Sequence, residues 1–144
     1  GLIGSAPKLQ QDSYHGHQLE AALLAQTQIR DLRGQTSLTQ LAGALQRTKL
    51  CVTLDTGPLH IAAAVGCPTI AIFGNNVTGA GASPIRLWAP RQPHVQLALS
   101  GVNCQHCETN QFKNQHCLLD EHLCMRNVSP LQVIHHMQAL LHQG

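Results

Sequence analysis

The sequence predicts an α/β protein with a parallel, Rossmann-like sheet held between two layers of helices. The first observation is the order of segments over residues 50–74. An apolar run at Leu50–Leu54 reaches a polar corner, a helix of small residues follows, and a second apolar run occupies Thr69–Phe73. Strand, turn, helix and strand form a βαβ unit, in which the two strands are parallel. The second observation is that helical and strand segments alternate along the chain, which favours a three-layer sandwich.

The chain has 144 residues, a length typical of one domain that buries roughly two-thirds of its unfolded surface. We therefore expect residues 1–144 to form a single domain. The opening segment Gly1–Ser5 resembles the end of a strand that runs into a glycine turn. This abrupt start indicates a piece of a larger protein.

Before the βαβ unit, the pattern predicts a helix over residues 14–28, a short strand over 29–32, a turn at Gly34 and a helix over 38–47. Ser37 is the expected N-cap of the second helix, because a serine hydroxyl can accept from the amides of the first turn. The expected apolar faces are Leu19, Ala22, Leu23 and Gln26 on the first helix, and Leu38, Leu41, Ala42 and Leu45 on the second.

After the βαβ unit, residues 75–93 are rich in Gly, Pro, Asn and Ala and predict a loop, and Val95–Leu99 predicts a strand. Ser129 followed by Pro130 is typical of a helix start, since proline at the first helical position forfeits no hydrogen bond. We expect the final helix over residues 131–142. Its expected buried face consists of Val133, Ile134, Met137, Leu140 and Leu141.

Composition argues against two classes of protein. Charged residues make up 11% of the chain, aromatic residues 3%, and the net charge of +2 comes from scattered side chains. Nucleic-acid binding through a basic stripe or a stacking platform is therefore poorly supported. No apolar stretch approaches the roughly 18 residues that span a bilayer, and no signal peptide is visible at the start.

The corner of the βαβ unit is the main candidate site. Ligands of open parallel sheets bind beyond the carboxyl ends of the strands, where a helix N-terminus presents unpaired N–H groups and a partial positive charge. Asp55 and Thr56 stand at that position, Gly57 lets a ligand approach the backbone, and Pro58 opens the helix. His60, in the first turn, suits a hydrogen bond to phosphate. The alternative is a capped helix and nothing more.

Two further strand ends offer weaker candidates. Residues 34–38 form a second corner, whose loop could line the pocket of a base or ribose, or could simply end in the Ser37 cap. Residues 78–82, after the strand that ends at Phe73, could close over a substrate or form a plain surface loop.

The cysteines fall into two groups. Cys51 and Cys67 lie in apolar stretches and are expected to be buried. The segment 103–126 is rich in cysteine, and its spacing leaves structural zinc, disulfides and unligated thiols open, since one C-x2-C pair suits tetrahedral zinc and the second pair is more widely spaced. The four candidate zinc ligands are Cys104, Cys107, Cys117 and Cys124.

Several motifs together resemble a known family. They are Asp31-Leu32-x-Gly34-x-Thr36-Ser37-Leu38, the block Asp55-Thr56-Gly57-Pro58-Leu59-His60 with Ala62-Ala63-Ala64 after it, Gly66-x-Pro68, and Ile72-Phe73-Gly74. The tail Cys104-x2-Cys107 and Cys124-Met125-x-x-Val128-x-Pro130-x-x-Val133 fits the same pattern. The chain resembles the C-terminal half of glycosyltransferase family 9, the ADP-heptose:lipopolysaccharide heptosyltransferases and their relatives.

The resemblance implies a GT-B architecture, in which this half holds the nucleotide-sugar donor and an N-terminal acceptor domain, absent here, carries the catalytic base. No catalytic residue is then expected in this chain, which alone should be inactive. The implied substrate-binding residues are Thr56, Gly57 and Pro58 for the diphosphate, Asp55 for sugar hydroxyls, His60 for the phosphates, Thr36 for the adenosine, and Leu59 within the same block.

The implied reaction is inverting transfer of a heptose from ADP-heptose to the lipopolysaccharide inner core. It requires no cofactor, because amides at a helix terminus stabilise the leaving ADP, and it takes place at the cytoplasmic face of the inner membrane. Two segments depart from the family pattern: Ser5-Ala6-Pro7-Lys8, where an acidic residue for the ribose is usual, and Asn75-Asn76-Val77-Thr78.

Two alternatives belong to other classes. One is another GT-B enzyme, such as a sugar-nucleotide epimerase, although the seven carboxylates of the chain include no evident catalytic pair. The other is a non-catalytic module in which a zinc knuckle mediates protein contacts.

Overall fold

The computed structural model describes residues 1–6, 17–74, 85–102 and 123–142. The chain divides into two compact units, Gly1–Gly43 and Ala44–Gly144. The expectation of a single domain over residues 1–144 stays a prediction.

The first unit contains helix α2 (His17–Gln26) and one parallel β-bridge between Leu2 and Asp31. The Leu2 amide donates to the Arg30 carbonyl at 2.8 Å, and the Leu32 amide donates to the Leu2 carbonyl at 2.9 Å. The strand expected over residues 29–32 is thus reduced to a single bridge. Helix α2 is confirmed within its described residues. Of its expected apolar face, Ala22, Leu23 and Gln26 are exposed, Leu23 by 41%, and the side chain of Leu19 lies outside the described residues.

Helix α3 (Leu38–Gln46) begins where the sequence predicts. The Gln40 amide donates to the Ser37 hydroxyl at 3.2 Å, and the Ser37 amide donates to the Gln40 side-chain oxygen at 2.9 Å. This reciprocal capping box confirms Ser37 as the N-cap. The turn at Gly34 is also confirmed, with a φ of +69°. Of the expected stripe, Leu41 and Leu45 are buried, whereas Leu38 is 74% exposed.

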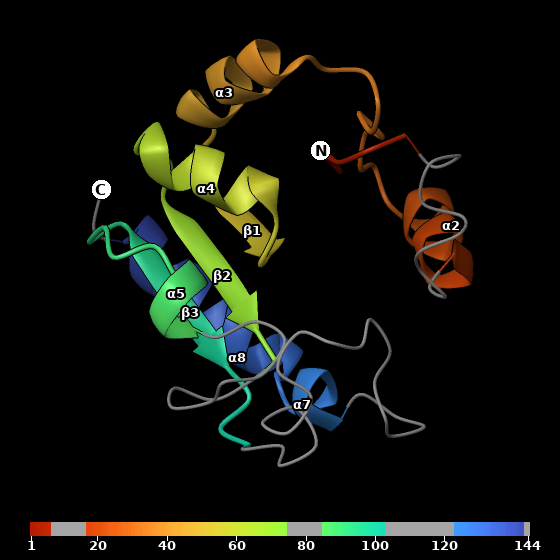
Figure 1. Cartoon of the computed structure of the whole chain (residues 1–144). Coiled ribbons are helices and arrows are strands. Elements are labelled where there is room, and N and C mark those ends of the chain that lie inside the picture. Colours follow the sequence, from red (N-terminus) through yellow and green to blue (C-terminus); the bar gives the residue numbers. More distant parts are fainter. Residues whose placement is uncertain (7–16, 75–84, 103–122, 143–144) are drawn as a thin grey trace. The chain divides into compact units, whose positions relative to one another are not determined.

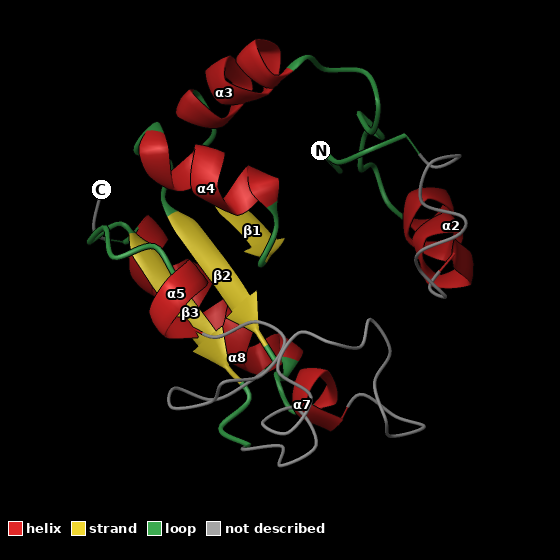
Figure 2. Ribbon diagram, viewed as in Figure 1, coloured by secondary structure: helices red, strands yellow, loops and turns green. Residues whose placement is uncertain are grey.

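The second unit is built on a parallel sheet of three strands in the order β1-β2-β3, namely Cys51–Leu54, Thr69–Phe73 and Val95–Leu99 (Figures 1 and 2). Cys51 pairs with Thr69, and Thr69 pairs with Val95. All three strands and their parallel direction agree with the sequence prediction. Because the strands are parallel, their carboxyl ends lie at one edge of the sheet.

Helices cover both faces of this sheet. On one face, Leu59 of α4 (Gly57–Ala64) and Ile85 of α5 (Ile85–Trp88) pack with Ala71 and Phe73. Successive side chains of a strand point to opposite faces. In β3, Leu97 packs against that same core cluster, so its neighbour Gln96 points to the other face. There Gln96 contacts His136 of α8 (Pro130–Leu141) at 2.9 Å. The predicted three-layer arrangement is therefore confirmed.

Two expectations for the second unit need correction. Residues 75–93 were expected to form a loop, but Ile85–Trp88 is a helical turn. This turn is fixed in place because Ile85 is buried in the core. Residues 75–84, which include the 78–82 loop, lie outside the described residues. In α8, Ser129 is confirmed as the N-cap, because the Gln132 amide donates to the Ser129 hydroxyl at 3.1 Å. The expected buried face is wrong, because no residue of α8 is fully buried: Val133, Met137 and Leu140 are half-buried. Ile134 and Leu141 are 43% and 48% exposed.

Replacing Leu59 should destabilise the second unit strongly. Leu59 is fully buried, and Leu→Ala at such a site typically costs about 2–5 kcal/mol because a cavity is left behind. We expect Leu59→Ala to lower the free energy of unfolding by that amount in urea titrations followed by circular dichroism. Leu131→Ala is the matched control, since Leu131 is 67% exposed. An equal effect of both changes would contradict the assigned role of Leu59.

Candidate functional site

The structure places the predicted corner at the carboxyl edge of the sheet. Strand β1 ends at Leu54, Asp55 and Thr56 form the turn, and helix α4 begins at Gly57. The sequence block therefore lies where ligands of parallel α/β sheets bind. The segment from Asp55 to Leu59 leads directly from the end of β1 into the first turn of α4.

The N-terminus of α4 has no side-chain cap from its N-cap residue. Thr56 has extended backbone angles (φ −149°, ψ 170°) and makes no capping hydrogen bond. Its hydroxyl lies 3.3 Å from the Leu54 carbonyl, to which it donates. Pro58, in the first turn, has no N–H to leave unsatisfied. The side chain of Thr56 therefore does not cap α4, and the prediction that this corner binds a ligand stays a prediction.

Gly57 stands before open space. A Cβ atom built on Gly57 would meet no other atom within 4 Å. The backbone of the first turn can thus be approached closely from outside. An anion placed there would meet N–H groups and the partial positive charge of the helix terminus.

Two ionisable side chains flank the helix terminus. His60 Nε2 lies 3.9 Å from Asp55 Oδ1, and the side chains are 47% and 18% exposed. Both can therefore reach solvent and a ligand. Leu59, between them and the sheet, points inward and is fully buried. Its side chain holds the helix in place, while Asp55 and His60 present the polar groups.

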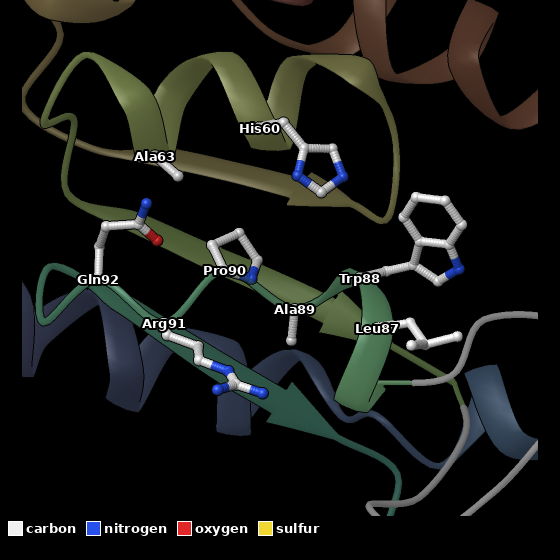
Figure 3. Close-up of a pocket in the computed structure, with 8 residues that line it drawn as sticks. All are labelled: His60, Ala63, Leu87, Trp88, Ala89, Pro90, Arg91 and Gln92. Atoms are coloured by element: carbon white, nitrogen blue, oxygen red, sulfur yellow. The ribbon is translucent and has the colours of Figure 1, made fainter.

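The structure also shows a neighbour that the sequence analysis missed. The ring of Trp88, from α5, lies with its centroid 6.4 Å from that of His60, at an interplanar angle of 63°. Beside them is an open hollow of about 510 Å³ (Figure 3), lined by His60, Ala63 and residues 87–92. Residues 75–93 looked like a loop, so only the presence of a lone tryptophan in that stretch could have drawn attention to it.

Thr36 belongs to the first unit, where it follows the turn at Gly34 and is half-buried. Charged side chains form hydrogen bonds around that turn. Both Asp31 carboxylate oxygens accept from the Arg33 guanidinium, at 2.9 and 2.8 Å, and Arg33 also donates to Glu20 of α2. The Arg33 bonds lower the pKa of Asp31 to about 2, and the Asp31 carboxylate raises the pKa of Arg33.

The predicted metal ligands are only partly described. Cys104, Cys107 and Cys117 lie outside the described residues, and Cys124 lies in α7 (Leu123–Arg126). Within the described ranges, no group of three His, Cys, Asp or Glu side chains is close enough to hold a metal. The sulfurs of Met125 and Cys124 come within 2.6 and 3.1 Å of a Cβ built on Gly74, so α7 packs against the carboxyl end of β2.

The other two cysteines are buried, as predicted. Burial raises the pKa of the Cys51 thiol to about 11 and raises that of Cys67 as well. Both are thus protonated at neutral pH and act as small apolar residues of the core.

A parallel sheet between helices, with an open helix N-terminus at its carboxyl edge, defines a Rossmann-like α/β protein. The family described as "Glycosyltransferase family 9 (heptosyltransferase)" matches residues 9–117. The chain belongs to this family. It is 28% identical over 113 residues to a lipooligosaccharide heptosyltransferase 2 of Campylobacter jejuni, covering 78% of this chain. It is 37% identical over 75 residues to the lipopolysaccharide heptosyltransferase 2 of Salmonella typhimurium and of Escherichia coli, covering 51% of this chain.

These matches cover only part of the relatives, 32% of the Campylobacter protein and 20% of the other two. The fold is also that of a solved structure, a family 9 glycosyl transferase from Veillonella parvula. The TM-score is 0.61 at 20% identity, over 99% of this chain and 37% of that one. The likeness supports the predicted fold class, a Rossmann-like sheet from a GT-B glycosyltransferase.

The interaction between Asp31 and Arg33 leads us to expect that the stability of the first unit falls in acid. The pKa of Asp31 is lower in the folded unit than its ordinary value of 3.8, so the Asp31–Arg33 interaction stabilises above about pH 4 and is lost as the pH falls toward 2. We expect the carboxyl resonance of Asp31 to titrate near pH 2 in NMR. Asp31→Asn should weaken the unit at neutral pH and flatten its acid transition. An unchanged acid transition in that variant would contradict the assignment.

Proposed function

We propose that this chain is the donor-binding part of an inverting glycosyltransferase that uses ADP-heptose, or a similar nucleotide sugar, in lipopolysaccharide core biosynthesis. The observation that carries the proposal is the open N-terminus of α4 at the carboxyl edge of the sheet, with Asp55 and His60 beside it. The names of the curated relatives support the reaction class, since those proteins are heptosyltransferases of lipopolysaccharide or lipooligosaccharide.

In this proposal, the diphosphate binds at the helix terminus. Backbone groups of Thr56, Gly57 and Pro58 lie against it, and the side chain of His60 hydrogen-bonds to its oxygens. The local charge favours an anion, because the sequence has no Asp or Glu between Asp55 and Glu108. Asp55, only 18% exposed at the strand end, accepts from hydroxyls of the sugar. The expectation that Thr36 contacts the adenosine concerns the first unit and stays a prediction.

The proposed chemistry divides the work between two parts of the enzyme. An acceptor hydroxyl attacks the anomeric carbon of the donor sugar while the bond from that carbon to the diphosphate oxygen breaks. Negative charge then develops on the ADP, where the helix terminus and His60 stabilise it without an essential metal. The base that takes the proton of the hydroxyl belongs to an N-terminal acceptor domain, so this chain alone binds the donor and does not transfer sugar.

The acceptor in this proposal is the lipopolysaccharide core, and the enzyme works in the cytoplasm at the inner face of the membrane. Among the described helices, none has the length and apolar character that crossing a bilayer requires.

Filling the space in front of the helix terminus should weaken donor binding. Gly57→Ala adds a methyl group where nothing lies within 4 Å, so the fold accepts it while the methyl group keeps phosphate from the backbone. One charge-assisted hydrogen bond is worth about 1.5–3 kcal/mol, which corresponds to a loss of roughly tenfold or more in ADP affinity. Isothermal titration calorimetry with ADP measures this change.

Gly43→Ala is the matched control, because a Cβ on this helical glycine also meets nothing within 4 Å. It should leave ADP affinity unchanged. NMR of the unaltered chain should show the amides of Thr56, Gly57 and His60 shifting as ADP is added. Binding of ADP with equal affinity to both variants would show that the nucleotide lies elsewhere.

We also propose that the cysteine-rich segment holds a structural zinc ion through Cys104, Cys107, Cys117 and Cys124. Elemental analysis should then find about one zinc per chain. Its removal by a chelator should lower the thermal midpoint while ADP affinity at low temperature stays unchanged, since zinc stabilises a fold without taking part in transfer. A zinc-free chain with the same thermal midpoint would contradict this assignment.

A further inference from the structure

Trp88 is the only tryptophan of the chain, and it stands half in solvent. It is 46% exposed although the helical turn that carries it is firmly anchored. Ile85, three residues earlier, is buried in the core, and the Ala89 amide closes the turn on the Ile85 carbonyl at 2.9 Å. The fold thus holds a large aromatic ring at the surface instead of covering it.

The ring has a specific neighbour at the candidate site. The centroids of Trp88 and His60 are 6.4 Å apart with the rings inclined by 63°, an edge-to-face contact. His60 Nε2 also lies 3.9 Å from Asp55 Oδ1. Three side chains from the β1–α4 corner, from α4 and from α5 therefore form one row beside the end of β1. Figure 3 shows His60 and Trp88 near each other among the residues that line the hollow.

The hollow next to this row is open to solvent and has the volume of a small-ligand site. Its volume of about 510 Å³ falls in the range of roughly 300–1,000 Å³ that such sites occupy. Ala63 leaves room on the α4 side, and Arg91 and Gln92 supply polar groups. An aromatic wall beside a few polar groups is the usual lining of a site that holds one ring in one orientation.

We propose that Trp88 is a specificity-determining residue that packs against the sugar ring of the nucleotide-sugar donor. The inference rests on the proposed function, which places the diphosphate at the terminus of α4. In that proposal His60 binds the diphosphate to which the sugar is bonded, and Trp88 contacts His60. The apolar indole face takes the C–H face of the sugar, while Asp55 binds hydroxyls from the other end of the row.

The lone tryptophan makes the proposal directly measurable in the 144-residue chain. Addition of ADP-heptose should change the intensity and the wavelength of Trp88 emission. ADP, which lacks the sugar, should bind and produce a clearly smaller change, because it reaches Trp88 only through His60. An equal change with both ligands would overturn the assignment to the sugar, because Trp88 would then sense the nucleotide.

Variants separate sugar contact from a structural role. Trp88→Ala should weaken binding of ADP-heptose by about tenfold, as expected from the loss of an aromatic contact, and change ADP affinity less than about twofold. Trp88→Phe, which keeps a ring, should restore most of the affinity. Leu131 is an exposed apolar residue of α8, so Leu131→Ala should leave the affinity for ADP and for ADP-heptose unchanged. Calorimetry measures all of these.

The possible failures are distinguishable. Trp88→Ala could weaken the binding of ADP and ADP-heptose equally, or weaken neither. Either result would overturn this inference and leave the proposed function standing. Failure of both ligands to bind the unaltered chain would overturn the proposed function, and this inference with it.

Discussion

The burial of Leu59 beneath helix α4 is the contact on which the candidate site depends. Leu59 is the third residue of α4, and its side chain is fully enclosed with Ala71, Phe73 and Ile85. Because a leucine one turn from the helix terminus is fixed against the central strand, the terminus itself is fixed at the carboxyl edge of the sheet. Small residues along α4, among them the buried Ala62 and Ala63, allow this close approach.

The same contact organises the neighbouring parts of the unit. Ile85 joins the cluster from α5, and this position sets Trp88 beside His60. His94, just before β3, lies with its ring nitrogen 3.0 Å from the Ala63 carbonyl and ties the other end of α4 to the sheet. The helix is thus held at both ends, and the polar side chains of its first turn occupy fixed positions.

Local sequence signals predicted the regular elements and the main corner well. The strands over 51–54, 69–73 and 95–99 and the caps at Ser37 and Ser129 follow from apolar runs and capping chemistry that act within a few residues. Burial was predicted less well, because it depends on what else packs nearby. Leu38 and Leu23 match a helical stripe in sequence but remain exposed. Trp88 escaped notice because its partner, His60, lies 28 residues away along the chain and is brought near only by the fold.

The absence of a Thr56 cap at α4 has a thermodynamic consequence. A serine- or threonine-type cap is commonly worth about 1 kcal/mol, so a terminus without this contribution from its N-cap side chain leaves the isolated second unit less stable than its core would permit. An anion that occupies the terminus satisfies the same amides and stabilises only the folded state. Under the proposed function, resistance to unfolding therefore rises with the concentration of the anion that binds at this terminus.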